Sequence, residues 1–290
     1  MKRTRSHLFA RLARIASLVI FAAFGTIALM RFAPGYFTDA REMDGEYAAG
    51  ARVSLQALHE QQRSFQTLTR LQFAGWLHGD LGRSRQFEVP VTELIKGRVH
   101  ITLRLLAYGT GLGWATALAL ALPLSARRGT RGEMLIASAT AILLSIPIGA
   151  LAIVSMLTEI GGPIGVLLLL IAARDFKILY RVLQRAWRAP HLLQARAQGL
   201  HPFRITFVHL LPSLLPQLAA VASTSFAMAL SSIVPVEVVF NVNGLGQLAW
   251  TAAMNRDLPV LLAVTLLLAL SIGIVTTMAE PRRAKMTPCG

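Results

Sequence analysis

The stretch that decides the fold is ITFVHLLPSLLPQLAAVASTSFAMALSSIVPV, residues 205–236, which contains no Asp, Glu, Lys or Arg. A helix needs about 20 apolar residues to cross the hydrocarbon core of a membrane, so this run is long enough to span it. Five more uncharged stretches occupy residues 15–30, 105–126, 134–158, 160–173 and 258–279. The sequence therefore predicts an all-α membrane protein with six transmembrane helices.

The composition agrees with a membrane protein. The 290 residues are 54% hydrophobic and 15% charged, whereas about a quarter of a soluble domain is charged. The first run becomes long enough if Arg14 and Arg31 extend their side chains toward the membrane surfaces. The run 160–173 is short and spans only if its helix continues through Arg174 and Asp175 toward Tyr180. A re-entrant or broken segment is the alternative there.

The distribution of charge predicts the topology. With a cytoplasmic N-terminus, the short outside loops around Glu159 and from Glu237 to Asp257 contain one basic residue, Arg256. Such a bias is the positive-inside pattern, and it predicts that both termini lie in the cytoplasm. The net charge of +15 is then explained by membrane topology and does not indicate binding to nucleic acid. The predicted inside segments contain Lys2, Arg3, Arg5, Arg11, Arg14, Arg127, Arg128, Arg131, Arg174, Lys177, Arg181, Arg185, Arg188, Arg196, Arg204, Arg282, Arg283 and Lys285.

The chain divides into three predicted regions. Residues 1–33 form a cytoplasmic N-terminus and the first span, which we expect to be uncleaved because Met30-Arg31-Phe32 offers no small-x-small cleavage site. Residues 34–97 form a periplasmic segment with seven basic and eight acidic residues, and loops longer than about 60 residues cross the membrane largely regardless of charge. Residues 98–290 form a five-span core with a cytoplasmic loop at about 185–212.

That cytoplasmic loop has the pattern of two short helices. Gly199 can take the left-handed conformation that ends a helix, and Pro202 occupies a favoured first-turn position for the next one. Ala195 and Ala197 keep the first helix thin, so that a partner surface could approach it closely. The sequence is equally consistent with a docking knob and with an amphipathic loop that lies on anionic lipid.

Catalytic and metal-binding patterns are absent from the sequence. It contains no GxxxxGK[ST] phosphate loop and no HExxH motif, and its seven histidines form no metal-ligand spacing. The single cysteine, Cys289, excludes a disulfide within the chain. Polar residues in the apolar runs are mostly Ser and Thr, which commonly bond to their own helix. We therefore predict no catalytic residue, no metal site and no enzyme activity, with energy supplied by another polypeptide.

Four ordered blocks of the sequence carry a resemblance. The loop residues Ala195-Arg196-Ala197-Gln198-Gly199-Leu200, followed by His209 and Pro212, resemble the EAA loop of ABC importer permeases of the dipeptide/oligopeptide/nickel branch. Gly79-Asp80-Leu81-Gly82-Arg83-Ser84, Val89–Ile95 and the C-terminal set are similar to further blocks of that branch. The C-terminal set comprises Glu237–Phe240, Gly244-Leu245-Gly246 and Arg256–Val260. The resemblance covers about residues 8–280. Gln198 replaces a common lysine, and Asn243 replaces a proline.

The resemblance implies a type I ABC importer permease in the bacterial inner membrane. Such a subunit pairs with a homologous second permease, receives solute from a periplasmic binding protein and moves peptides by alternating access. Two ATPase subunits would dock on the loop and bind ATP and Mg, so this chain is expected to bind no cofactor. The alternatives are nickel or another small solute, an exporter variant, or a membrane scaffold or enzyme without transport.

The other blocks supply candidates for the periplasmic gate or rim of the path. They are Gly79, Asp80, Gly82, Ser84, Glu237, Gly244, Gly246 and Asp257. The glycines would allow tight turns, for which ordinary loop turns are the alternative explanation. A structural ion pair between Glu237 and Arg256 is as consistent with the sequence as solute contact. Arg104 either faces the path or extends to the membrane surface.

Overall fold

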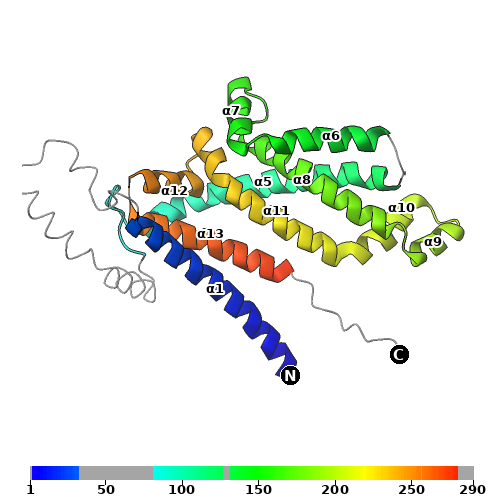
Figure 1. Ribbon diagram of the computed structural model, residues 1–290, viewed down its shortest axis with the longest axis horizontal. Helices are drawn as coiled ribbons and strands as arrows, with labels where there is room; N and C mark the ends of the chain where they lie inside the picture. Colours follow the sequence, from blue (N-terminus) through cyan, green and yellow to red (C-terminus); the bar gives the residue numbers. More distant parts are fainter. Residues whose placement is uncertain (1, 33–80, 127–130, 256, 280–290) are drawn as a thin grey trace, which may run out of the picture. The chain divides into compact units, whose positions relative to one another are not determined.

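The computed structural model describes residues 2–32, 81–126, 131–255 and 257–279, and these are helical apart from short connections. An isolated antiparallel bridge joins Arg83 and Pro90. The helices appear in chain order in Figure 1: α1 (Lys2–Phe32), α5 (Val91–Ala126), α6 (Arg131–Ser145), α7 (Ile148–Thr158), α8 (Gly162–Ala186), α9 (Pro190–Ala197), α10 (Pro202–Arg204), the π-helix η1 (Ile205–Leu210), α11 (Leu211–Val239), α12 (Leu245–Met254) and α13 (Leu258–Ala279).

Three helices among the described residues are long and apolar enough to cross a membrane. They are Val91–Ala126, the continuous helix Pro202–Val239, and Leu258–Met278, while the apolar helix Leu12–Ala28 is shorter. The predicted class, an all-α membrane protein, is confirmed. The six-span count stays a prediction, and most of the predicted periplasmic segment 34–97 lies outside the described residues.

The apolar run 134–158 differs from the single straight span that the sequence predicts. It forms two helices, Met134–Ser145 and Ile148–Thr158, that meet at 98°. Pro147 lies at the break, where it has no N–H to donate and disfavours helical geometry at Ile146. The run can therefore cross the membrane only as a bent pair.

The doubtful run 160–173 belongs to one unbroken helix, α8. Gly161 adopts a left-handed φ of 79°, and Pro163 lies in the first turn of the helix that follows. The helix continues through Arg174 and Asp175 to Ala186, as the spanning alternative required. Its 25 residues are long enough for a span at 1.5 Å per residue.

One compact unit comprises residues 1–101 and 243–273. Its core joins the first turns of α5 to α12 and to the beginning of α13, through Val91, Leu245, Leu248, Ala249, Ala252, Val260, Ala263 and Val264. A Cβ at Gly273 of α13 would lie 3.5 Å from Ile15 Cγ2 of α1, an ordinary van der Waals contact. This unit therefore gathers segments from both ends of the chain.

The second compact unit contains residues 102–242, with α6, α7, α8, the loop elements and α11. The small residues of α5 allow α8 to approach closely. A Cβ at Gly109 would lie 2.6 Å from Leu167 Cβ, and one at Gly113 would lie 2.9 Å from the Leu168 carbonyl oxygen. Small residues at these two positions therefore serve helix packing, whereas a Cβ at Gly111 would meet nothing within 4 Å.

Candidate functional site

The loop between α8 and α11 contains two short helices, α9 and α10, joined by a tight corner. α9 begins at Pro190 and ends at Ala197, and Gly199 follows with a left-handed φ of 73°. Leu200 N–H donates to the Ala195 carbonyl at 3.3 Å, and Gly199 N–H donates to the Arg196 carbonyl at 3.0 Å. This is the Schellman pattern of a helix C-terminus, and it confirms the predicted helix end at Gly199.

The chain restarts its helix at the predicted position. Pro202 is the first residue of α10, and Phe203 N–H donates to His201 Nδ1 at 3.3 Å. The six residues that follow α10, Ile205–Leu210, form the π-helix η1 and include His209. Pro212 follows in the first turn of α11, and the Leu211 N–H donates to the Thr206 carbonyl five residues earlier. Pro212 cannot supply the next helical N–H, which favours this wider turn.

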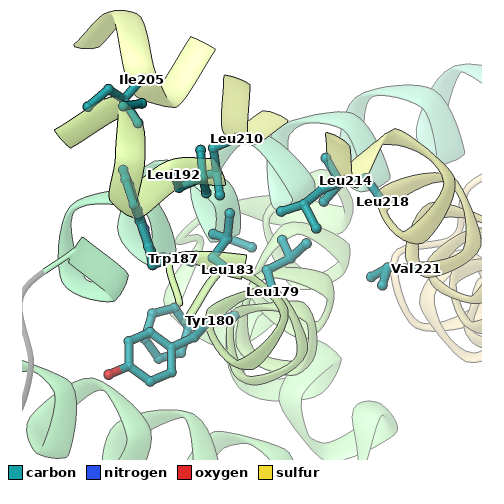
Figure 2. Packing of buried hydrophobic residues seen from close by; sticks show 14 residues of the cluster. Leu179, Tyr180, Leu183, Trp187, Leu192, Ile205, Leu210, Leu214, Leu218 and Val221 are labelled. Atoms are coloured by element: carbon teal, nitrogen blue, oxygen red, sulfur yellow. The ribbon is translucent and has the colours of Figure 1, made fainter. Parts of the chain in front are cut away.

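A buried apolar cluster holds the loop on α8 and α11. Leu192 of α9, Ile205 and Leu210 of η1 and Leu183 of α8 are almost completely buried together (Figure 2). The cluster continues along both long helices through Leu179, Leu214, Leu218 and Val221. The loop is therefore part of a packed core rather than a ribbon that only covers a surface.

Trp187 holds this loop through one hydrogen bond and one contact of its ring with a cation. Its indole N–H donates to Ser125 Oγ at 3.1 Å, which ties the end of α8 to the end of α5. The Arg196 guanidinium lies over its ring, 4.5 Å from the centroid. A cation held against an aromatic face stabilises the position of α9.

An open groove of about 550 Å³ borders the loop. Trp187, Arg196 and Leu200 line it together with Leu122, Pro123, Ala126, Pro202, Phe203, Ile205, Thr206 and Phe207. Phe203 and Phe207 are 65% and 49% exposed, and their ring centroids are 4.4 Å apart. The groove therefore combines a basic side chain with an exposed aromatic pair.

The predicted coupling residues occupy different parts of this structure. Arg196, Ala197, Gln198 and Gly199 are exposed around the corner, whereas Ala195 is buried on the cluster. Leu200 and His209 are half-buried, and Pro212 is exposed on α11. The structure thus brings the predicted set together at one end of the α8–α11 hairpin.

Two rim candidates from distant blocks meet in the first unit. Ser84 Oγ–H donates to Asp257 Oδ2 at 2.5 Å, and Gln86 N–H donates to the same oxygen at 3.3 Å. Ser84 Oγ also accepts from Phe87 N–H at 2.9 Å, which closes the turn 84–87. Gly82 adopts the left-handed φ of 82° that a tight turn requires. Both Ser84 and Asp257 are buried, so the contact is shielded from solvent.

The remaining rim candidates are placed separately. Glu237 is buried in the second unit and accepts from the Thr102 hydroxyl at 2.7 Å. Gly244 precedes α12 with an extended backbone, and Gly246 lies inside that helix rather than in the tight turn expected for it. Gly79, Asp80 and Arg256, the predicted partner of Glu237, lie outside the described residues. Arg104 is exposed on α5.

Sequence reasoning missed Asp175 as a functional candidate. This carboxylate lies in the middle of α8 with no exposed surface, and its Oδ2 accepts from Ser225 Oγ–H of α11. The available signal was an acidic residue two positions after a long apolar run and between Arg174 and Lys177, because a carboxylate beside apolar residues is costly to bury unless it is paired. Among the described residues no group of His, Cys, Asp or Glu could hold a metal ion.

Comparison with known proteins identifies the class. Residues 109–285, more than half of the chain, match the model of the family described as binding-protein-dependent transport system inner membrane component. The chain belongs to this family. It is therefore a permease subunit of the ABC importer type, an integral inner-membrane protein and not an enzyme.

The relatives match at low identity over shares of this chain that range from 32% to 94%. A Brucella suis protein named as a peptide transport system permease is 24% identical, over 94% of this chain and 96% of its own length. A Sinorhizobium fredii peptide ABC transporter permease is 32% identical over 32% of each chain. A Staphylococcus aureus protein named as a metal-staphylopine import system permease is 23% identical, over 75% of this chain and 76% of its own length.

Proposed function

We propose that this chain is the permease subunit of an ATP-driven importer that moves peptides across the bacterial inner membrane by alternating access. The observation that supports the proposal best is the corner at Gly199, built on the core shared by α8 and α11. A short helix in that position presents a rigid surface at one end of two membrane-length helices. Force applied to the surface is transmitted to both helices through packed side chains.

We propose the groove beside this corner as the docking site of an ATPase subunit. Phe203 and Phe207 expose apolar area that is unfavourable in water, and aromatic side chains often form the anchors of protein interfaces. Arg196 adds a positive charge at the same surface. Ala197 and Gly199 are exposed and present little side-chain bulk, which allows close approach of the partner.

The proposed complex contains a second homologous permease, two ATPase subunits and a periplasmic binding protein. ATP and Mg would bind to the ATPase subunits, and this chain would hold no cofactor. Both termini would lie in the cytoplasm. Gly79, Asp80, Gly82, Ser84, Glu237, Gly244, Gly246 and Asp257 are proposed for the periplasmic rim. The buried Ser84–Asp257 contact supports a structural part for two of these residues in holding that rim.

Peptides are the proposed solute because the relatives from Brucella and Sinorhizobium are named for peptide transport. The Staphylococcus relative named for metal-staphylopine import favours a second candidate, a metal complex such as one of nickel. Isothermal titration of the purified periplasmic binding protein with dipeptides, oligopeptides and nickel would separate them. Binding of nickel without any peptide binding would overturn the peptide assignment.

Co-purification tests the docking proposal. We expect Phe203→Ala together with Phe207→Ala to lower the amount of ATPase recovered with a tagged permease by at least tenfold, since each truncated anchor typically costs about 1 kcal/mol or more of binding free energy. Phe87→Ala is the matched control, because Phe87 is also exposed but belongs to the other unit. Equal recovery from the double variant and the control would refute docking at the groove.

A further inference from the structure

Asp175 is an expensive residue that the proposed docking and rim sites leave unused. It lies at the fourteenth position of the 25-residue helix α8 and is 0% exposed. A fully buried carboxylate is costly unless it is paired. Its Oδ1 lies 3.6 Å from Arg174 Nη1, and neither of these two atoms makes a hydrogen bond within the part of the chain that the structure describes.

The bond that Asp175 does make joins two particular helices. Ser225 Oγ–H of α11 donates to Asp175 Oδ2 across 50 positions of sequence. α8 is the helix that enters the loop, and α11 is the helix that leaves it. Both helices and the loop between them lie in the second unit, where α8 and α11 pack along each other (Figure 1).

The apolar cluster under the loop ends where this hydrogen bond begins. On α11 the buried side chains Leu214, Leu218 and Val221 follow one another toward the interior (Figure 2). Ser225, also buried, is the next residue in that spacing of three and four positions. On α8 the corresponding face includes Leu183, Leu179 and Phe176, which is next to Asp175. Packing and the polar contact therefore form one continuous line from the loop into the interior of both helices.

Ser225 does not need Asp175 for its own hydrogen bonding. Its hydroxyl also lies 2.8 Å from the Val221 carbonyl of the same helix, and a hydroxyl has one proton to donate. Ser225 would thus stay satisfied without the carboxylate, as the neighbouring buried Ser223 is by the Ala220 carbonyl alone. The carboxylate adds a connection between helices that the stability of α11 does not require.

We propose that Asp175 is a positioning residue of the transport cycle, which locks α8 to α11 through Ser225 so that the two helices move with the loop as one body. Without this bond, the connection between the interior parts of α8 and α11 would be weaker, so a displacement of the loop would move the two helices together less closely. This inference rests on the proposed function, because it assumes that an ATPase displaces the loop.

The test uses the full complex in liposomes, with Cys289→Ser as background and spin labels at Leu169→Cys and Ser231→Cys. These two residues are exposed, and each lies six positions beyond the lock on α8 and α11. Pulsed EPR would compare the distance between the labels without nucleotide and with ATP and vanadate. We expect the unmodified lock to give the same distance distribution in both states.

Asp175→Leu and Ser225→Ala should each give a distribution that shifts or broadens with ATP and vanadate. Stimulation of ATP hydrolysis by the binding protein should fall about threefold, the typical effect of one polar contact between membrane helices. Asp175→Leu also removes a buried charge, which can change the thermal stability of the fold. If Asp175 had only that structural role, the variant would change thermal stability, and the label distance would stay the same with and without ATP and vanadate. Ser223→Ala is the matched control and should behave like the unmodified complex.

The outcomes separate the two proposals. If the unmodified complex shows no stimulation of ATP hydrolysis by the binding protein, the proposed function fails. If that stimulation is present and both lock variants match Ser223→Ala in distance and stimulation, the positioning role alone is overturned. If the complex with Ser225→Ala does not assemble, the comparison of Asp175→Leu with Ser223→Ala decides the outcome.

Discussion

Gly199 shows how much a single residue determines at the corner between α9 and α10. A Cβ at this position would meet nothing within 4 Å, so space does not require a glycine there. The requirement comes from the backbone, whose φ of 73° is unfavourable for most L-residues. The sequence predicted this conformation correctly because a glycine between two short helical patterns is a local signal.

Replacing Gly199 by valine should weaken docking, because a β-branched residue in the left-handed region costs about 1–2 kcal/mol. Gly199→Asn is the matched variant, since asparagine tolerates this region better than other residues. We expect the valine variant to lose binding-protein-stimulated ATP hydrolysis while the asparagine variant keeps most of it. Equal activity of the two variants would contradict a role for the backbone conformation.

The Ser84–Asp257 contact is a second case in which one side chain supports a larger arrangement. Ser84→Ala would remove the hydroxyl donor of a buried carboxylate and the acceptor of the Phe87 N–H. An unsatisfied buried group costs about 1–3 kcal/mol, so the thermal unfolding midpoint in detergent should fall. Ser231→Ala, at an exposed serine that bonds to the Met228 carbonyl of its own helix, should leave the midpoint unchanged. A similar midpoint in both variants would disprove the contribution of the contact.

Among the elements, the pair α5 and α8 depends on small residues. Gly109 and Gly113 are four residues apart, so they lie on one face of α5. Both glycines lie closer to α8 than any side chain would allow. The sequence shows small residues along this segment but not which of them touch a partner, because that depends on the crossing of two helices.

Gly113→Ala should destabilise the protein by about 1–3 kcal/mol, the usual cost of overpacking. The added methyl group would lie 2.9 Å from the Leu168 carbonyl oxygen and 2.9 Å from Ile171 Cβ, so the helices must shift. Gly111→Ala is the control, with no atom within 4 Å of the new Cβ and a helix propensity gain of up to about 1 kcal/mol. Thermal unfolding in detergent would measure both, and a destabilisation of equal size in the control would refute the packing argument.

For the whole molecule, the number of membrane crossings depends on the bent pair and on α8. The bent pair at Pro147 and the helix α8 correspond to two of the six spans that the sequence predicts. The positive-inside pattern places the basic residues before the pair and those after α8 on the same side of the membrane, and we predict that the pair and α8 each cross between them.

Reporter fusions would test this topology directly. We expect a fusion after Arg128 to be cytoplasmic, one after Ile160 to be periplasmic, and fusions after Arg188 and Gly290 to be cytoplasmic. An alkaline phosphatase and a green fluorescent protein reporter give opposite signals, so each position has its own control. A cytoplasmic signal after Ile160 would mean that the bent pair re-enters the membrane surface instead of crossing it.

The sequence by itself determined the helical membrane class, the expected orientation and the corner at Gly199. Each of these follows from local information: the length of apolar runs, the charges in short loops, and a glycine between helical patterns. Only the tertiary structure decided the bend at Pro147, the contact of Ser84 with Asp257 and the pairing of Asp175 with Ser225. All three depend on how parts of the chain are placed in space. The two contacts join residues that are far apart in the sequence, and the bend sets the direction of the helix after Pro147 relative to the helix before it.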